Sequence, residues 1–291
     1  MVTSWQHSLD DFLTVAGLAE MPMGMYFSDI EPKSTFSPTP LALPTRQNEI
    51  DNRVDWPTVF GNFSCAIGHI WRARKKKTAA YFSAERFGCL GCAFWMGFNK
   101  PQLEAIIHYV STGIPDHMEG EHYCDSPHRL RHIFENLDPE PAPGKFCVFK
   151  PLNQFTDGEQ PLFVVVFDRP EAIAGMHQLA TFVTGNPLCV ASPWSAACGS
   201  LVAWPMYFQA RGENLAVLGG WDISARKFFK GDEITLTVPL PMFEQMVARY
   251  PESFLTRKPW TTVKKKIARS RQVWGESIAA IPDEATNIIV D

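Results

Sequence analysis

Apolar residues in this chain follow helical spacing in some segments and form strand-like runs in others. Near the N-terminus they recur at the helical period from Leu9 to Ala16, and Gly17 follows them, which predicts a helix. Residues 23–32 (MGMYFSDIEP) predict a strand that runs into a turn. Residues 161–170 (PLFVVVFDRP) form a continuous apolar run, which is typical of a strand buried on both faces. Residues 171–185 then predict a helix that ends at a glycine.

The intervening segments show the same alternation of elements. Residues 65–76 (CAIGHIWRARKK) predict a helix with a cationic end, and residues 78–84 (TAAYFSA) predict a strand. Residues 31–47 contain four prolines and predict an extended surface loop. Residues 101–113 predict a helix that has Pro101 in its first turn. This alternation indicates an α/β or α+β fold.

The two halves of the chain carry similar patterns. Phe27 and Pro101 are 74 residues apart, and Phe167 and Pro241 have the same spacing, with a helical segment after each proline. Cys65 in the first half and Cys198 in the second half each come at the start of an apolar segment that is expected to be helical. We therefore expect two pseudo-repeated strand-helix halves packed as one compact domain. The predicted parts are residues 1–114, a connecting segment 115–150, a second half 151–250 with Cys198, and an extension 251–291.

Composition narrows the class of protein. The chain has 291 residues, a net charge of -4 and a pI near 6.1, which provides no general field for nucleic acid. The basic runs 72–77 and 264–266 fit solvated helix ends. The N-terminus lacks a signal-peptide pattern, and no segment has the 18 apolar residues that a membrane span needs. We expect a soluble cytoplasmic protein with no membrane or nucleic-acid partner. The sequence does not determine the oligomeric state.

The cysteines carry the first candidate chemistry. Seven cysteines without a secretion signal argue against a disulfide framework. Cys89 and Cys92 form a C-x-x-C turn, and Cys65 and Cys198 would complete a four-cysteine set for an iron-sulfur cluster or zinc. The aromatic residues around the turn favour a shielded cluster over a zinc knuckle. Two alternatives stay open: four buried apolar residues, or a redox dithiol, although no strand feeds a W-C-x-x-C helix start.

A second group of residues predicts ligand contact. Trp95 follows the C-x-x-C turn, and Trp221 follows two glycines, so each offers a stacking plane. Arg226 offers a fork for a carboxylate or phosphate, and the alternative that stays open is a hairpin with a buried Trp221 and a surface Arg226. The segment from His117 to His132 contains four histidines, of which two are spaced for one helical face. Because that segment is polar and contains proline, we interpret it as a solvated loop and a surface helix.

Several segments together resemble a known family. These are MPMGMYFSDIEP, FSCAIGHIW, FGCLGCAFWMGF, VVVFDRPEAIAGM, SPWSAACGSLVAWP and SARKFFKGDEITLTVP. Over roughly residues 10–250 the chain resembles domain of unknown function 169, an uncharacterised family of bacteria and archaea. The pattern of that family has cysteines at the positions of Cys65, Cys89 and Cys198, a glycine at Gly97 and an arginine near Arg226, so the resemblance supports the three cysteines.

At position 92 the family more often has glycine or alanine than cysteine, so the resemblance implies a site of three cysteines. Three thiolates hold a cluster with one open iron, or a zinc with a bound water.

The sequence thus predicts a metal- or iron-sulfur-cluster-binding protein, with redox or small-molecule chemistry at a cysteine site between two halves. Its expected partners are a small-molecule ligand or a redox partner. The alternative is a binding module without catalysis that holds an apolar or tetrapyrrole-like molecule and has no metal. A third hypothesis is a structural subunit of a larger assembly. No enzyme signature such as a Walker loop, G-x-S-x-G or H-E-x-x-H assigns a reaction.

Overall fold

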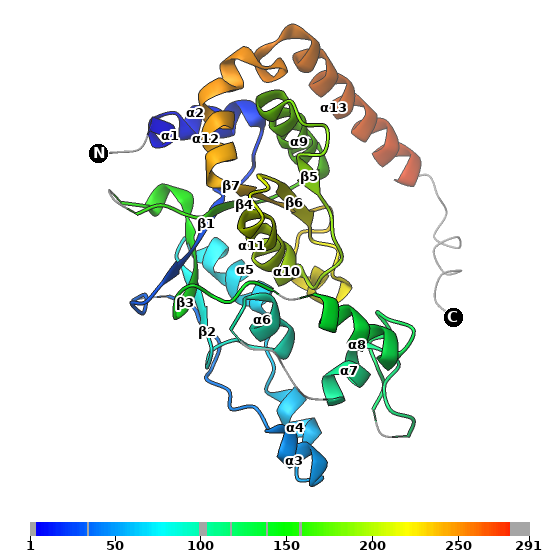
Figure 1. Cartoon of the computed structure of the whole chain (residues 1–291). Coiled ribbons are helices and arrows are strands. Elements are labelled where there is room, and N and C mark those ends of the chain that lie inside the picture. Colours follow the sequence, from blue (N-terminus) through cyan, green and yellow to red (C-terminus); the bar gives the residue numbers. More distant parts are fainter. Residues whose placement is uncertain are drawn as a thin grey trace.

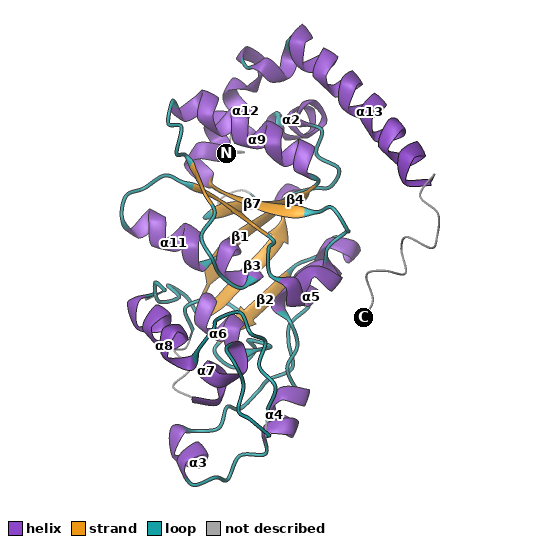
Figure 2. Ribbon diagram, turned by 90° about the vertical axis from the view of Figure 1, so that its right-hand side faces the viewer, coloured by secondary structure: helices purple, strands orange, loops and turns teal. Residues whose placement is uncertain are grey.

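One seven-stranded sheet runs through the molecule, with helices on both of its faces (Figure 1 and Figure 2). The structure is a computed structural model and describes residues 4–33, 35–98, 104–116, 118–137, 139–156 and 159–279. The strand order is β2-β3-β1-β4-β7-β6-β5. The mixed fold class expected from the alternating elements, in one compact domain, is confirmed.

The strands pair antiparallel, except that β5 and β6 pair parallel. Their bounds are β1 (Met23–Ser28), β2 (Ala80–Ser83), β3 (Phe146–Pro151), β4 (Phe163–Asp168), β5 (Val190–Ala191), β6 (Ala216–Gly219) and β7 (Ile234–Pro239). The fully buried β4 lies at the centre, as its continuous apolar run predicted. Its side chains alternate between the faces: Phe163, Val165 and Phe167 enter one core, while Val164 and Val166 enter the other.

Each face of the sheet is covered by its own set of helices. One core packs α5 (Ala66–Lys76), α6 (Leu90–Trp95), α10 (Ala197–Leu201) and α11 (Ala203–Ala210) against the sheet. The opposite core packs α1 (Ser4–His7), α2 (Leu9–Ala16), α9 (Pro170–Thr184) and α12 (Leu240–Arg249). All four cysteines of the predicted set lie on the first face, so this face is where the site has to form.

Several predicted elements end where local chemistry requires. The helix predicted near the N-terminus is α2, and Gly17 caps it in the left-handed conformation with a φ of 76°. Helix α9 ends in the same way at Gly185, with a φ of 67°. Helix α5 begins after Cys65 and has cationic residues in its last turn, where the negative end of the helix dipole stabilises them. The proline-rich stretch is extended, with an isolated bridge at Phe36.

The remaining elements lie at the ends and edges of the body. They are α3 (Arg46–Ile50), α4 (Trp56–Gly61), α7 (Glu104–Val110), α8 (Pro127–Asn136), α13 (Lys258–Ala279), and the 3-10 helices η1 (Leu152–Gln154), η2 (Ile223–Phe228), η3 (Tyr250–Glu252) and η4 (Phe254–Thr256). Helix α13 extends away from the rest of the chain (Figure 1). Pro101, where we predicted a helix start, and His117 lie outside the described residues. None of the described helices has the length and apolar character to cross a membrane.

The sheet bears on the predicted duplication without confirming it. Strands β1 and β4 pair at the centre, with β3 and β2 on one side and β7 and β6 on the other. However, β3 follows α7 in the chain, whereas α12 follows β7, so the helices that we matched occupy different places relative to the strands. Residues 146–150, which we placed in the connecting segment, belong to β3 and pair with β1 and β2. The duplication stays a prediction.

Candidate functional site

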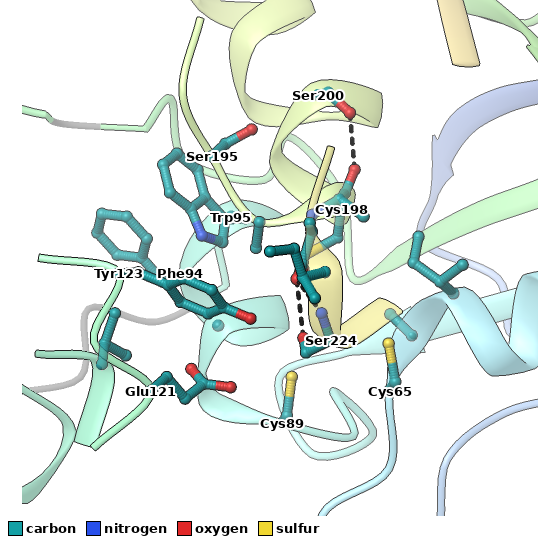
Figure 3. Close-up of a pocket in the computed structure, with 18 of the residues that line it drawn as sticks. Cys65, Cys89, Phe94, Trp95, Glu121, Tyr123, Ser195, Cys198, Ser200 and Ser224 are labelled. Atoms are coloured by element: carbon teal, nitrogen blue, oxygen red, sulfur yellow. Dashed lines mark hydrogen bonds between the residues drawn. The ribbon is translucent and has the colours of Figure 1, made fainter. Parts of the chain in front are cut away.

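A cavity of about 560 Å³ lies on the face that holds the cysteines (Figure 3). Cys65, Cys89 and Cys198 all line it, although they come from three segments that are far apart in the sequence. Cys65 precedes α5, Cys89 precedes α6 and Cys198 lies in the first turn of α10. The fold therefore brings the three cysteines implied by the family resemblance to one pocket.

The first two of these cysteines are held side by side by the backbone. The amide of Ser64 donates a hydrogen bond to the carbonyl of Gly88, with an N–O distance of 2.9 Å. Gly88 has a φ of 79°, and a Cβ atom there would lie 2.4 Å from the Ser64 carbonyl oxygen. Only glycine combines this backbone angle with so close an approach. The contact fixes Cys65 and Cys89 next to each other in the wall.

Helix starts explain where the sulfur atoms find hydrogen-bond donors. The first amides of a helix have no partner within the helix. The Cys89 sulfur accepts from the Cys92 amide at 3.4 Å, and the nearby amides of Ile67 and Gly68 lower the pKa of the Cys65 thiol against the larger effect of burial. Such amides lower the energy of a thiolate, which is a property of thiolate ligands and of reactive cysteines alike.

Burial nevertheless keeps the three pocket thiols protonated. Burial, followed by the neighbouring Cys65, raises the pKa of Cys89 to about 12. Burial also raises the pKa of Cys65, and burial with Cys89 nearby raises the pKa of Cys198 well above its ordinary value. In the part of the chain that the structure describes, no group of three or more His, Cys, Asp or Glu residues is arranged to hold a metal ion.

Cys92 has a different place from the other three. Its side chain is fully buried in the core, it does not line the cavity, and its sulfur lies 3.3 Å from the Met96 sulfur. Because Cys89 stands just before α6 and Cys92 lies within it, the two sulfurs of the C-x-x-C turn face different surroundings. Cys92 thus lies outside the cavity wall but close to the trio, since burial and then Cys198, Cys89 and Cys65 raise the pKa of its thiol.

Aromatic side chains form most of the remaining wall. Trp95 and Trp221 both line the cavity, at the places where ligand contact was predicted. Trp95 is 3% exposed, whereas Trp221 is 54% exposed and donates from its indole N–H to the Ser192 hydroxyl at 3.0 Å. Further aromatic lining residues are Phe60, Phe63, Phe94, Tyr109, Tyr123, Phe134 and Trp194.

Arg226 has a place different from the predicted one. It is not part of the cavity wall, because its guanidinium donates to the carbonyls of Gly220, Lys230, Gly231 and Glu233. Its planar group therefore holds the turn between β6 and β7 together. The guanidinium N–H groups that we expected to bind a ligand are therefore used in hydrogen bonds within the protein.

The two glycines before Trp221 serve close packing. A Cβ atom on Gly219 would lie 2.1 Å from the Ser200 hydroxyl oxygen, so glycine lets α10 approach β6. Asp222 follows, and its carboxylate accepts from the amide of Ala197 at 3.0 Å and from the amide of Ser224 at 3.0 Å. One carboxylate therefore caps the starts of α10 and η2 at the pocket.

Glu121 is among the ionisable pocket residues that the sequence analysis missed, together with Asp222 and Lys227. The pKa of Glu121 is raised to about 7, first by burial and then by the nearby Asp222, while the Tyr109 hydroxyl acts in the opposite direction. Figure 3 shows Glu121 and Tyr123 on one side of the cavity and Cys65 and Cys89 on another. Glu121 lies in the loop that we expected to be solvated, and no sequence signal marked it.

The histidines of that same segment do not join the pocket. His128 and His132 are exposed on α8, in agreement with the predicted surface helix, and neither lines the cavity. His132 approaches the Asn136 side chain. This segment supplies the pocket with Glu121, Tyr123 and Phe134 instead.

Comparison with known proteins identifies one family. The profile of DUF169, described as "Uncharacterised ArCR", matches residues 12–249. The matched region includes the sheet, all the lining residues of the cavity and α12, and it ends before α13. Neither the curated proteins nor the solved structures gave a match.

Proposed function

Because the chain belongs to the DUF169 family, which is uncharacterised, we propose its function from the pocket itself: it binds a small molecule with an apolar body against three neutral thiols. The single observation that carries this proposal is the cavity of about 560 Å³ lined by Cys65, Cys89, Cys198 and nine aromatic residues. Cavities of roughly 300–1,000 Å³ with mostly apolar walls are the usual ligand sites of proteins.

The form of the wall supports binding over simple packing. A core normally fills its interior to crystal-like density, so a cavity of this size beside buried aromatic rings is space for an occupant. The N-terminal and C-terminal parts of the chain both contribute to the wall. Cys65 and Cys89 come from the N-terminal part, and Cys198 and Trp221 come from the C-terminal part. Neutral thiols are weakly polar and polarisable, and they suit an apolar or tetrapyrrole-like surface.

A neutral fluorescent probe, N-phenyl-1-naphthylamine, tests the proposal directly. We expect saturable binding with one site per chain. Gly91 lines the cavity, and a Cβ atom on it would meet only Cys89 and Trp95, both at 3.9 Å. Gly91→Phe should therefore fill the space and weaken probe binding at least tenfold. Gly231→Phe, a matched change in open space away from the cavity, should leave binding unchanged. Equal binding by both variants would refute the pocket as the site.

The cysteine trio supports a second candidate, a metal or iron-sulfur cluster held by Cys65, Cys89 and Cys198. The observation that favours it is the set of helix-start amides that face the sulfurs of Cys65 and Cys89. Thiolates are needed for such ligation, so binding must overcome the raised pKa values. Anaerobic purification should then yield iron with acid-labile sulfide, or zinc, that Cys→Ser changes at these positions remove. A metal-free protein that binds the naphthylamine probe would support the first candidate and rule out the second.

A further inference from the structure

Two carboxyl groups face this aromatic cavity, those of Glu121 and Asp222. In the part of the chain that the structure describes, neither of them joins an ion pair. A carboxylate beside apolar walls costs free energy unless a cation or several donors compensate it. The two groups differ in how far the protein itself compensates them.

Asp222 is satisfied within the fold. Its carboxylate accepts from the amides of Ala197 and Ser224 and from the Ser224 hydroxyl, the last at 2.8 Å. Glu121 has much less support: among the described residues, Tyr109 is the group that lowers the pKa of its carboxyl group. Half-buried Glu121 is therefore the acidic group in the wall that is left for an occupant.

The aromatic residues add to the same preference. Nine aromatic rings line the cavity, among them the indoles of Trp95, Trp194 and Trp221. The face of an aromatic ring carries partial negative charge and attracts cations, most strongly for tryptophan. Rings together with a carboxylate form the environment in which proteins bind substituted ammonium groups.

Among the described residues that line the cavity, Lys227 is the one lysine or arginine. Its ammonium group lies 5.3 Å from the centre of the Phe228 ring. The starts of α6, α10 and η2 direct amides toward the site, but the Cys89 sulfur and Asp222 accept from them. These contacts reduce the attraction for an anion.

We propose that the occupant of the cavity is an organic cation, whose protonated or quaternary nitrogen lies beside Glu121 while its apolar body extends toward the three thiols. This inference rests on the proposed function, since it names the ligand class of the same pocket. In this proposal Glu121 selects for a positively charged ligand, and the aromatic side chains make most of the contacts with the body of the ligand.

Three probes of similar shape and different charge test it: phenyltrimethylammonium, neutral tert-butylbenzene and anionic benzenesulfonate. Each is measured on the full chain at pH 8 by displacement of N-phenyl-1-naphthylamine. We expect the ammonium probe to bind about tenfold more tightly than its neutral counterpart, a difference typical of partly desolvated cation–π and carboxylate contacts. Glu121→Gln should remove most of that preference.

Glu119→Gln is the matched control, because Glu119 is exposed, lies two residues away and does not line the cavity. It should keep the preference for the ammonium probe. Trp194→Leu is a second variant that leaves Glu121 in place. It should weaken binding of the ammonium probe more than binding of the neutral probe.

The outcomes separate the two proposals. If the naphthylamine binds but the ammonium and neutral probes compete equally, or benzenesulfonate competes best, the cation inference is overturned and the pocket function stands. The same holds if Glu121→Gln and Glu119→Gln behave alike. If the naphthylamine does not bind at all, the proposed function fails, and the cation inference fails with it.

Discussion

The guanidinium of Arg74 and the carboxylate of Glu233 form a two-point ion pair, with N–O distances of 2.5 and 3.1 Å. The side chains are 6% and 3% exposed, and the guanidinium also lies over the Phe167 ring at 4.1 Å. Glu20 adds a third contact at 2.7 Å. One arginine in α5 thus ties the helix that follows Cys65 to the segment just before β7.

Replacing this arginine should destabilise the protein strongly. Arg74→Met leaves Glu233 buried without its cation, and such a loss costs about 3–5 kcal/mol. Urea denaturation measures the change in the free energy of unfolding. The double variant Arg74→Met with Glu233→Gln should recover a large part of the loss, because the uncompensated charge is then gone. A single variant within about 1 kcal/mol of the original chain would show that the pair contributes little.

Gly88 should be intolerant of any side chain. Gly88→Ala forces an unfavourable positive φ and brings a Cβ atom to 2.4 Å from the Ser64 carbonyl. Gly212→Ala is the matched control, since Gly212 has a φ of 73° and open space around it. We expect a loss of about 1 kcal/mol for the control, from the backbone angle alone, and of at least about 2 kcal/mol more for Gly88→Ala. Thermal unfolding of the two variants compares the costs, and equal losses would contradict the close contact.

The pocket thiols should react slowly with alkylating agents at pH 8. A pKa of about 12 leaves Cys89 with about a thousandfold fewer thiolates than an ordinary cysteine, and the thiolate is the reacting form. Cys147 in β3 is fully buried and should react more slowly still. Mass spectrometry after timed iodoacetamide treatment gives the rate at each cysteine, with the urea-unfolded chain as reference. Fast labelling of Cys89 in the folded chain would argue for a reactive thiolate.

Glu121 should make stability depend on pH in a defined direction. Its pKa is raised from 4.5 to about 7 in the folded state, so the unfolded chain ionises first as the pH rises. Stability is therefore lost between pH 4.5 and 7 and stays reduced above that range. Asp222, Tyr109, Tyr123 and Lys227 also face this part of the pocket.

Glu121→Gln removes that titration. Its melting temperature should equal that of the original chain near pH 4.5 and exceed it at pH 8, by on the order of 2 °C. Glu119→Gln should show no such change between the two pH values. A constant offset for Glu121→Gln at both pH values would indicate a packing effect instead of a carboxyl group with a raised pKa.

Much of the fold was readable from local patterns. The helix that ends at Gly17, the buried strand β4 and the helix that ends at Gly185 all follow from periodicity and cap residues. The placement of β3 was not readable, because its partners in the sheet are separated from it by more than a hundred residues for β1 and by about sixty for β2. Sequence distance hides which edge a strand joins.

The site divides in the same manner. The gathering of Cys65, Cys89 and Cys198 in one pocket agrees with the set that family resemblance implied, and Trp95 and Trp221 stand beside them. Arg226 could not be placed, because its carbonyl partners depend on how the turn before β7 folds inward. Glu121 went unnoticed for a similar reason: its polar loop gave no sign that tertiary packing covers it.

Trp221 and Tyr123 are the lining residues that combine aromatic contact with substantial exposure, at 54% and 38%, next to Trp194 at 47%. Trp221 donates a hydrogen bond to the Ser192 hydroxyl, and Tyr123 lies near Ser224. We expect an occupant to pass these rim rings on its way in and out, which requires the Trp221–Ser192 hydrogen bond to open, while the sheet and the thiol wall stay in place. Residence time then becomes separable from affinity, because the rim sets the exchange rate and the deep wall sets the equilibrium.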